Sequence, residues 1–218
     1  MKIRFRIRKG PPVRWLSHLD LSRAWMRAMI RAELPLEYSE GYNPHPKLAF
    51  SPALPVGIVG ESEYVDVAFS ETVEAASAIE RLNAAVPPGL EATGGIPLPT
   101  GRKVPSLAGS VTAADYRIVI EGITPAEMDQ ALTEYDITVK KMDGERKAPV
   151  LIDLEAGDGR TRAVIRVPMC VRPLTIFAGI QNLDRDTLLS RAQIDRIALW
   201  EIINGRLVDP LAAVGCSR

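Results

Sequence analysis

Hydrophobic and charged residues alternate strictly over the first eight positions of the chain. Ile3, Phe5 and Ile7 fall on one face, and the other face carries Lys2, Arg4, Arg6 and Arg8. A period of two is typical of a β-strand with one buried face. Gly10-Pro11-Pro12 ends the alternation, so we predict an N-terminal strand with an apolar face and a basic face.

A helix is predicted from Ser17 to about Ala32. Ser17 and Asp20 have the spacing of a capping box, and Pro35 marks the end. Its predicted apolar side consists of Leu19, Leu21, Trp25, Met26, Met29 and Ile30. Its arginines recur every four residues and should form one exposed row: Arg23, Arg27 and Arg31.

The rest of the first hundred residues predicts strands and a second helix. Four prolines between positions 44 and 55 exclude a helix there and indicate an ordered loop with a short strand on each side. Alternation over 63–69 predicts a strand with Val65, Val67 and Phe69 inward. We expect a helix over 72–82 and an edge strand over 90–96.

Beyond residues 97–110, whose Pro, Gly and Ser content is typical of a linker, a similar order of elements returns. The expected strands are 116–121, 137–142, 149–154, 162–167 and 194–203, the expected helices are 124–134 and 173–191, and the expected turns are Gly157-Asp158-Gly159 and Asn204-Gly205. We therefore predict an α+β fold of two ferredoxin-like halves, with mostly antiparallel sheets and helices packed on one face. The predicted domains are 1–100 and 113–218, joined by a linker at 101–112.

Composition narrows the classes of protein and site. The chain has 218 residues, 46% of them hydrophobic and 25% charged, as in ordinary soluble proteins. Its two cysteines and two histidines lack the spacing of metal ligands, so we expect no metal and no cofactor. No apolar run approaches the ~20 residues that span a bilayer, and the N-terminus lacks the apolar core of a signal peptide. We expect a cytoplasmic protein without membrane contact.

No nucleotide-binding GxxxxGK[ST] or GxGxxG motif and no GxSxG nucleophile motif occurs in the sequence, which favours a non-catalytic protein over an enzyme.

The formal net charge of zero conceals two opposed segments. Residues 1–50 hold ten Lys or Arg against four Asp or Glu, a net charge of +6, whereas residues 51–100 hold one against seven, a net charge of −6. Because local fields decide where an anionic partner docks, the basic segment is a candidate RNA-binding region.

Arg4, Arg6 and Arg8 are expected on the open face of the N-terminal sheet, where guanidinium groups bind phosphates and stack on bases. The same region adds further basic candidates: Lys9, Arg14, Arg23, Arg27 and Arg31. An alternative stays open, in which the like charges protect an edge strand from pairing with another chain.

A second group of candidate RNA contacts is Tyr42, Asn43, His45 and Lys47, on a loop stiffened by Pro44 and Pro46. A stiff loop loses little entropy on binding, and these side chains suit base stacking, base edges and phosphate. The alternative is a purely structural turn. His18 and His45 are the candidate acid–base residues, although His18 also fits a polar group near a helix cap.

The sequence resembles the radical-SAM-linked domain family, bacterial proteins that occur free-standing or fused C-terminal to B12-binding radical SAM proteins. The resemblance rests on Arg14-Trp15-Leu16-Ser17-His18-Leu19-Asp20-Leu21, Gly41-Tyr42-Asn43-Pro44-His45-Pro46-Lys47, Leu54-Pro55-Val56-Gly57 and Asp195-Arg196-Ile197-Ala198-Leu199-Trp200. It implies a partner radical SAM enzyme and a setting of RNA or ribosomes, since members tend to be encoded near a ribonuclease of the E/G type and ribosomal proteins. The chain lacks CxxxCxxC and so resembles the form that holds no iron–sulfur cluster.

Three functions are therefore expected to compete. The first is an RNA-binding or substrate-presenting accessory of a radical SAM enzyme that modifies tRNA or rRNA. The second is a metal-independent RNA-processing enzyme that uses His18 or His45. The third is a protein–protein adaptor, which pairing of Arg4, Arg6 and Arg8 with Glu61, Glu63 or Asp66 would favour.

Overall fold

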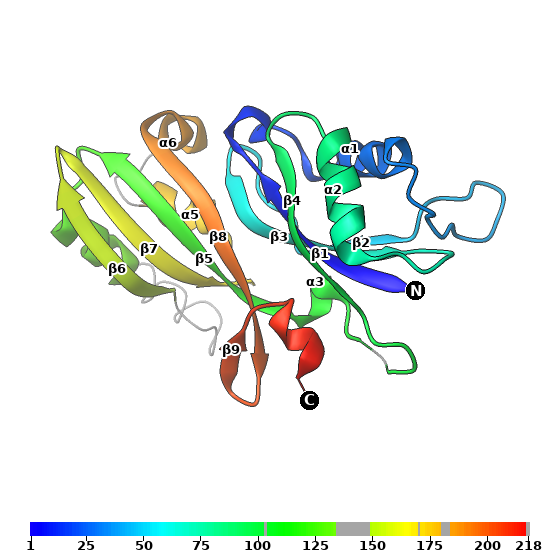
Figure 1. Ribbon diagram of the computed structural model, residues 1–218. Helices are drawn as coiled ribbons and strands as arrows, with labels where there is room; N and C mark the ends of the chain where they lie inside the picture. Colours follow the sequence, from blue (N-terminus) through cyan, green and yellow to red (C-terminus); the bar gives the residue numbers. More distant parts are fainter. Residues whose placement is uncertain (103, 134–148, 170, 180–183, 217–218) are drawn as a thin grey trace. The chain divides into compact units, whose positions relative to one another are not determined.

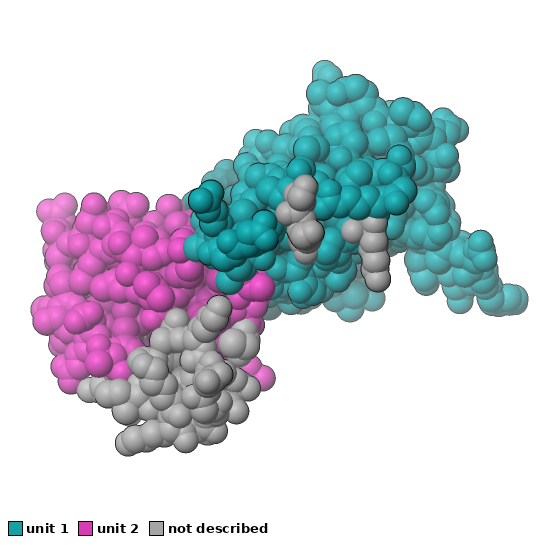
Figure 2. Space-filling view, turned by 90° about the horizontal axis from the view of Figure 1, so that it is seen from below, with its two compact units in different colours: residues 1–111, 199–218 teal, residues 112–198 magenta. Residues whose placement is uncertain are grey.

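The computed structural model describes residues 1–102, 104–133, 149–169, 171–179 and 184–216. The chain is a mixed α+β protein that divides into two compact units, coloured separately in Figure 2. Unit 1 comprises Met1–Val111 and Leu199–Arg218, and unit 2 comprises Thr112–Ala198. The chain passes from unit 1 to unit 2 after Val111 and returns to unit 1 at Leu199.

Unit 1 has the element order β-α-β-β-α-β. Its elements are β1 (Lys2–Lys9), α1 (His18–Arg31), β2 (Leu48–Phe50), β3 (Val59–Ala68), α2 (Ala75–Ala85) and β4 (Leu90–Pro97). β1 lies between β4 and β3, and β2 pairs with β3 on the far side. All three pairings are antiparallel. Helices α1 and α2 cover one face of this sheet (Figure 1).

The apolar face of β1 forms the centre of the unit 1 core, as its alternation predicts. Ile3, Phe5 and Ile7 are at most 1% exposed, and they belong to one cluster with Trp25 of α1 and Leu82 of α2. Val65, Val67 and Phe69 join the same cluster from β3 and its end, which confirms their inward prediction. Burial of such side chains is worth about 1.5–3 kcal/mol each.

Helix α1 starts at the predicted cap but buries a narrower face than expected. The Ser17 hydroxyl accepts a hydrogen bond from the Asp20 backbone N–H. Trp25 and Met29 are fully buried, whereas Leu19 and Ile30 are 58% and 49% exposed. The prediction that Leu19 and Ile30 belong to the buried side is wrong, because they lie at the margins of the apolar stripe.

Two other boundaries in unit 1 differ from the predicted ones. Helix α2 begins at Ala75 instead of residue 72, because the Glu74 carboxylate caps it by accepting from the N–H groups of Ala76 and Ser77. The predicted linker is partly ordered, since it contains α3 (Leu107–Ser110), whose Leu107 is fully buried.

Gly95 in the edge strand β4 has a packing reason to lack a side chain. A Cβ atom there would lie 2.9 Å from the Phe5 ring.

Unit 2 contains β5 (Val111–Glu121), β6 (Val150–Gly157), β7 (Arg160–Pro168), α5 (Pro173–Gly179), α6 (Arg185–Arg191) and β8 (Ala192–Ile203). Its strand order is β8-β5-β7-β6, and residues 125–133 are helical. The predicted β6–β7 turn is confirmed by positive φ at Asp158 and Gly159. The predicted strand 137–142 lies outside the described residues.

The last residues of β8, from Leu199 onward, belong to unit 1. The predicted turn at Asn204-Gly205 is confirmed by φ of 51° and 76°, and it leads into β9 (Arg206–Val208), which pairs with β8. A short 3-10 helix, η2 (Ala212–Gly215), follows. The segment 199–216 therefore contributes polar groups from the C-terminal part of the sequence to unit 1.

Candidate functional site

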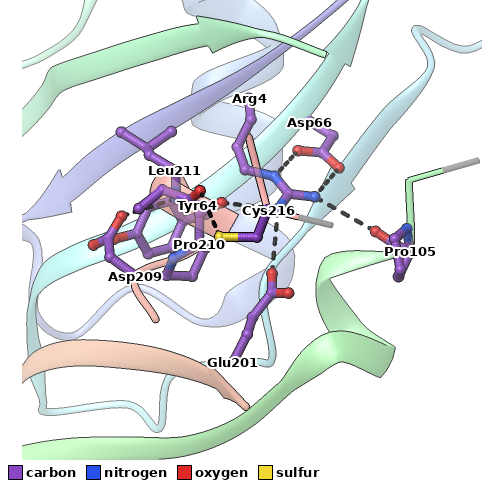
Figure 3. A network of polar contacts seen from close by, with 10 residues as sticks. Arg4, Tyr64, Asp66, Pro105, Glu201, Asp209, Pro210, Leu211 and Cys216 are labelled. Atoms are coloured by element: carbon purple, nitrogen blue, oxygen red, sulfur yellow. Dashed lines mark hydrogen bonds and ion pairs between the residues drawn. The ribbon is translucent and has the colours of Figure 1, made fainter. Parts of the chain in front are cut away.

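Arg4, the first candidate on β1, is buried and fully occupied by partners within unit 1. Its Nε and Nη2 donate to the two carboxylate oxygens of Asp66 at 2.7 and 2.9 Å, from the directly opposed position on β3 (Figure 3). Its Nη1 donates to Glu201 Oε1 at 3.3 Å and to the Pro210 carbonyl at 3.1 Å. A bidentate pair with further hydrogen bonds compensates the cost of burying the charge.

Arg6 lies beside a second polar cluster, which is half-buried. Its Nη2 donates to Asp209 Oδ2 at 2.8 Å, and the Tyr64 hydroxyl donates to the same oxygen at 2.6 Å. Burial raises the pKa of Tyr64 well above its ordinary value, and Asp209 adds to the rise, so the hydroxyl stays protonated and donates.

The remaining basic residues of β1 differ in exposure. Lys9 is 1% exposed and donates from Nζ to the Leu16 carbonyl at 3.0 Å, whereas Arg8 is exposed and lies 3.9 Å from Glu91. The prediction that the basic face of β1 is open is therefore wrong for Arg4, and Lys9, a further basic candidate of the region, is buried as well. Side chains from β3 and residues 199–210 cover Arg4, and the chain entering α1 covers Lys9.

A different set of candidates is exposed along α1 and the turn before it. We call Arg14, Trp15, Leu19, Arg23, Arg27, Ile30 and Arg31 the α1 surface. Trp15 is 55% exposed, and the Arg14 guanidinium lies 5.0 Å from the centre of its ring. The predicted exposed row is confirmed: all three arginines reach solvent, with Arg31 also donating to the Ala85 carbonyl at 2.7 Å. An indole with one guanidinium at its ring thus precedes a helix that presents three more guanidinium groups along its length.

The loop candidates are divided between solvent and an ion pair. Tyr42 is fully exposed, and Asn43 and His45 are exposed as well. Lys47 Nζ instead donates to Glu37 Oε1 at 2.5 Å, and this hydrogen bond lowers the pKa of the Glu37 carboxyl. Three of the four side chains thus remain available to a ligand.

His18 is part of the packing at the start of α1. Its ring meets Phe50 edge to face, with centroids 5.8 Å apart, and its carbonyl accepts from the Ser22 hydroxyl. These contacts suit a residue of the helix start.

A cavity of about 730 Å³ lies in unit 1 next to the Arg4 pair. Its walls come from β2, from β3 and from residues 98–102 and 104–106, with Asp66 and Pro105 contributing both to the wall and to the contacts of Arg4. Its charged lining residues are Lys2, Glu37, Lys47, Asp66 and Arg102. Sequence reasoning did not single out Glu37 or Arg102, since neither belongs to a motif.

Glu201 and Asp209 were also missed as partners of the basic strand. The opposite net charges of residues 1–50 and 51–100 were a usable signal for the Arg4–Asp66 pair. No comparable signal indicated the carboxylates of the C-terminal segment. Among the described residues, no helix is both long and apolar enough to cross a membrane.

A family model described as an uncharacterised protein conserved in bacteria (DUF2344) matches residues 2–157. This match covers the whole of β1 and α1, residues 39–47 and all the described residues that line the cavity except Met1. No curated protein matches the sequence.

Proposed function

The chain belongs to this uncharacterised bacterial family, and we propose that it is an accessory protein that binds single-stranded RNA through the α1 surface. The observation that carries the proposal is the exposed Trp15 with Arg14 over its ring, at the start of a helix that presents three exposed arginines. Unpaired bases stack on aromatic rings, and guanidinium groups neutralise phosphates. The α1 surface offers both in one place.

The loop between α1 and β2 adds contacts of the same kind. Tyr42 can stack on a base, and Asn43 and His45 can hydrogen-bond base edges, because all three side chains are exposed. Pro44 and Pro46 restrict the loop and reduce the entropy lost on binding. Arg4 and Lys9 take no part in this proposal, because they are buried.

We further propose that the partner is a radical SAM enzyme that modifies tRNA or rRNA. The motifs around Ser17-His18-Leu19-Asp20 and Asn43-Pro44-His45-Pro46-Lys47 support this by resemblance. The strand orders β4-β1-β3-β2 and β8-β5-β7-β6 support a ferredoxin-like architecture for each unit. In this arrangement the protein presents RNA and the partner performs the chemistry.

The test is RNA affinity as a function of salt. For single strands, the slope of log affinity against log salt concentration is about −0.7 for each phosphate neutralised. We expect the triple variant Arg23→Gln/Arg27→Gln/Arg31→Gln to flatten this slope by about 2. The control triple Arg160→Gln/Arg162→Gln/Arg206→Gln removes the same charge from exposed positions on β7 and β9. The proposal would be refuted by an RNA affinity that does not change with salt concentration, or by equal losses of RNA affinity in the two triple variants.

A second function, a protein–protein adaptor, is favoured by two observations. Arg4 pairs with Asp66, the internal neutralisation that such a protein predicts. Leu19 and Ile30 also expose apolar surface on α1. The discriminating variant is Leu19→Asp/Ile30→Asp: an adaptor loses its complex with the radical SAM partner in size-exclusion chromatography even after ribonuclease treatment. An RNA-mediated complex is lost on ribonuclease treatment of the unmodified protein.

A further inference from the structure

We infer that the cavity beside Lys2, Lys47 and Arg102 is a binding site for an organic anion of nucleotide size. Its volume of about 730 Å³ falls within the roughly 300–1,000 Å³ typical of small-molecule sites. The choice of a nucleotide as the anion rests on the proposed function. The site itself rests on the cavity and its charges.

The walls of the cavity suit the body of such a ligand. Leu48 and Ala49 of β2, Ala68 of β3 and Leu98 and Pro105 of the following segment provide apolar surface. Sites for small molecules combine apolar walls with a few charged or polar groups that fix orientation. A base or a ribose can therefore lie against these walls while a charged group meets the rim.

The charges of the cavity leave an excess of positive charge. Glu37 is engaged by Lys47 at 2.5 Å, and both oxygens of Asp66 accept from Arg4. Among the described residues, neither Lys2 nor Arg102 forms an ion pair, and both side chains are exposed. Because three cations and two carboxylates line the cavity, and Asp66 is already bound by Arg4 from outside that lining, the remaining positive charge favours an anion.

The buried guanidinium of Arg4 holds two walls of the cavity together. It binds Asp66 on β3 and donates to the Pro105 carbonyl at 3.5 Å on the opposite segment (Figure 3). Arg102 is held in turn by a 2.6 Å hydrogen bond from its Nη2 to the Cys216 carbonyl. The shape of the cavity is thus determined before a ligand arrives, which lowers the entropic cost of binding.

The inference is tested by titrating the full-length protein with adenosine and uridine 5′-monophosphates, followed by calorimetry. Adenosine alone and inorganic phosphate serve as the two halves of the ligand. We expect each nucleotide to bind at least 10-fold more tightly than either half. A nucleoside that binds as tightly as its monophosphate would overturn the inference.

Two variants test the location. Lys2→Gln/Arg102→Gln removes the uncompensated charges, and Ala49→Trp fills the cavity from an exposed position of β2. We expect each to weaken nucleotide binding at least 10-fold. The matched controls are Arg8→Gln/Arg23→Gln for charge and Thr93→Trp for a bulky side chain on an exposed strand position. Binding unchanged in Lys2→Gln/Arg102→Gln or in Ala49→Trp would overturn the inference.

The same experiment separates this site from the α1 surface. The variant Arg23→Gln/Arg27→Gln/Arg31→Gln should retain nucleotide binding while it loses RNA affinity. A protein that binds nucleotide but no RNA would refute the proposed function, while it would support the cavity as a site for a free nucleotide. A protein that binds RNA but no nucleotide would refute the cavity site alone.

Discussion

Two sets of regularly spaced basic residues in unit 1, one on β1 and one on α1, differ in whether the fold covers their central members. Arg4 on β1 is 1% exposed and pairs with Asp66 and Glu201, whereas Arg23 on α1 is 54% exposed. Both sets follow the period of their own element. Regular spacing therefore identifies the face on which a residue lies, and tells nothing of what covers that face.

The difference follows from the position of each element. β1 is flanked by two strands, and residues that follow β8 bring Asp209 and Pro210 to its basic face. Helix α1 packs on the sheet through Trp25 and Met29, so its other side faces solvent. Arg4 on β1 is a structural crosslink, whereas the three arginines of α1 reach solvent.

The largest effect is expected for Arg4→Met. Removal of the guanidinium breaks the bidentate pair with Asp66 and the ion pair with Glu201 at a position that is 1% exposed, which costs about 3–5 kcal/mol. Denaturant unfolding measures the change in the free energy of unfolding. The control Arg27→Met, at an exposed position, should change it by no more than about 0.5 kcal/mol. Similar changes in the free energy of unfolding for the two variants would contradict the distinction between Arg4 on β1 and the arginines on α1.

Trp15→Ala is expected to weaken RNA binding with little effect on stability. Stacking of a base on an aromatic ring is worth about 1–3 kcal/mol, or about 5- to 150-fold in affinity. Fluorescence anisotropy with a labelled oligoribonucleotide measures the loss. Trp15→Phe keeps a stacking ring and should restore most of the affinity. If the alanine variant binds RNA as tightly as the unmodified protein, Trp15 does not stack on a base.

Ser17→Ala tests how firmly the helix that presents the arginines is anchored. The Ser17 hydroxyl accepts from the Asp20 N–H at 3.2 Å, and loss of such a cap costs about 1 kcal/mol. Thermal unfolding measures the effect. Ser22→Ala is the control, since the Ser22 hydroxyl donates to a carbonyl inside the helix. A larger loss for Ser22→Ala would contradict the role of the cap.

The smallest effect is expected for Glu74→Gln at the N-terminus of α2, and it depends on pH. The other end of α2 contacts α1, because the Ala85 carbonyl accepts a hydrogen bond from Arg31. Hydrogen bonds from the backbone N–H groups of Ala76 and Ser77 lower the pKa of Glu74 below its ordinary value. The charged carboxylate is therefore stabilising above that ordinary value, and its contribution disappears as the pH falls through the lowered pKa. We expect Glu74→Gln to be less stable than the unmodified protein at pH 7, and the two to converge at acid pH. A difference that persists or grows in acid would contradict this role.

The local sequence pattern was sufficient to predict an element where that element packs against one continuous hydrophobic core. The inward faces of β1 and β3, the cap at Ser17 and the turn at Asn204-Gly205 each depend on a few neighbouring residues, and each was predictable. Leu19 and Ile30 were assigned wrongly because the width of a buried stripe depends on the partner surface.

Pairing of Arg4 with Asp66 was one of the predicted alternatives, but the burial of Arg4 could not be predicted because its other partners come from a distant segment. Asp66 is 62 positions away, and Glu201 is 197 positions away. The cavity was missed for the same reason, since its charged residues come from separate segments of unit 1. The sequence identifies Lys2 and Lys47 as basic residues, but only the fold places them beside Arg102.

The return of residues 199–216 to unit 1 has a consequence for how the protein is made. At about 5–20 residues per second, a ribosome needs on the order of 10–40 s to proceed from Arg4 to Glu201. During that interval Asp66 can already be in place, but Glu201 and Pro210 have not yet been synthesised. The nascent chain thus carries an incompletely neutralised cation on β1 during this interval. The polar contacts of β1 are completed long after the strand itself has been synthesised.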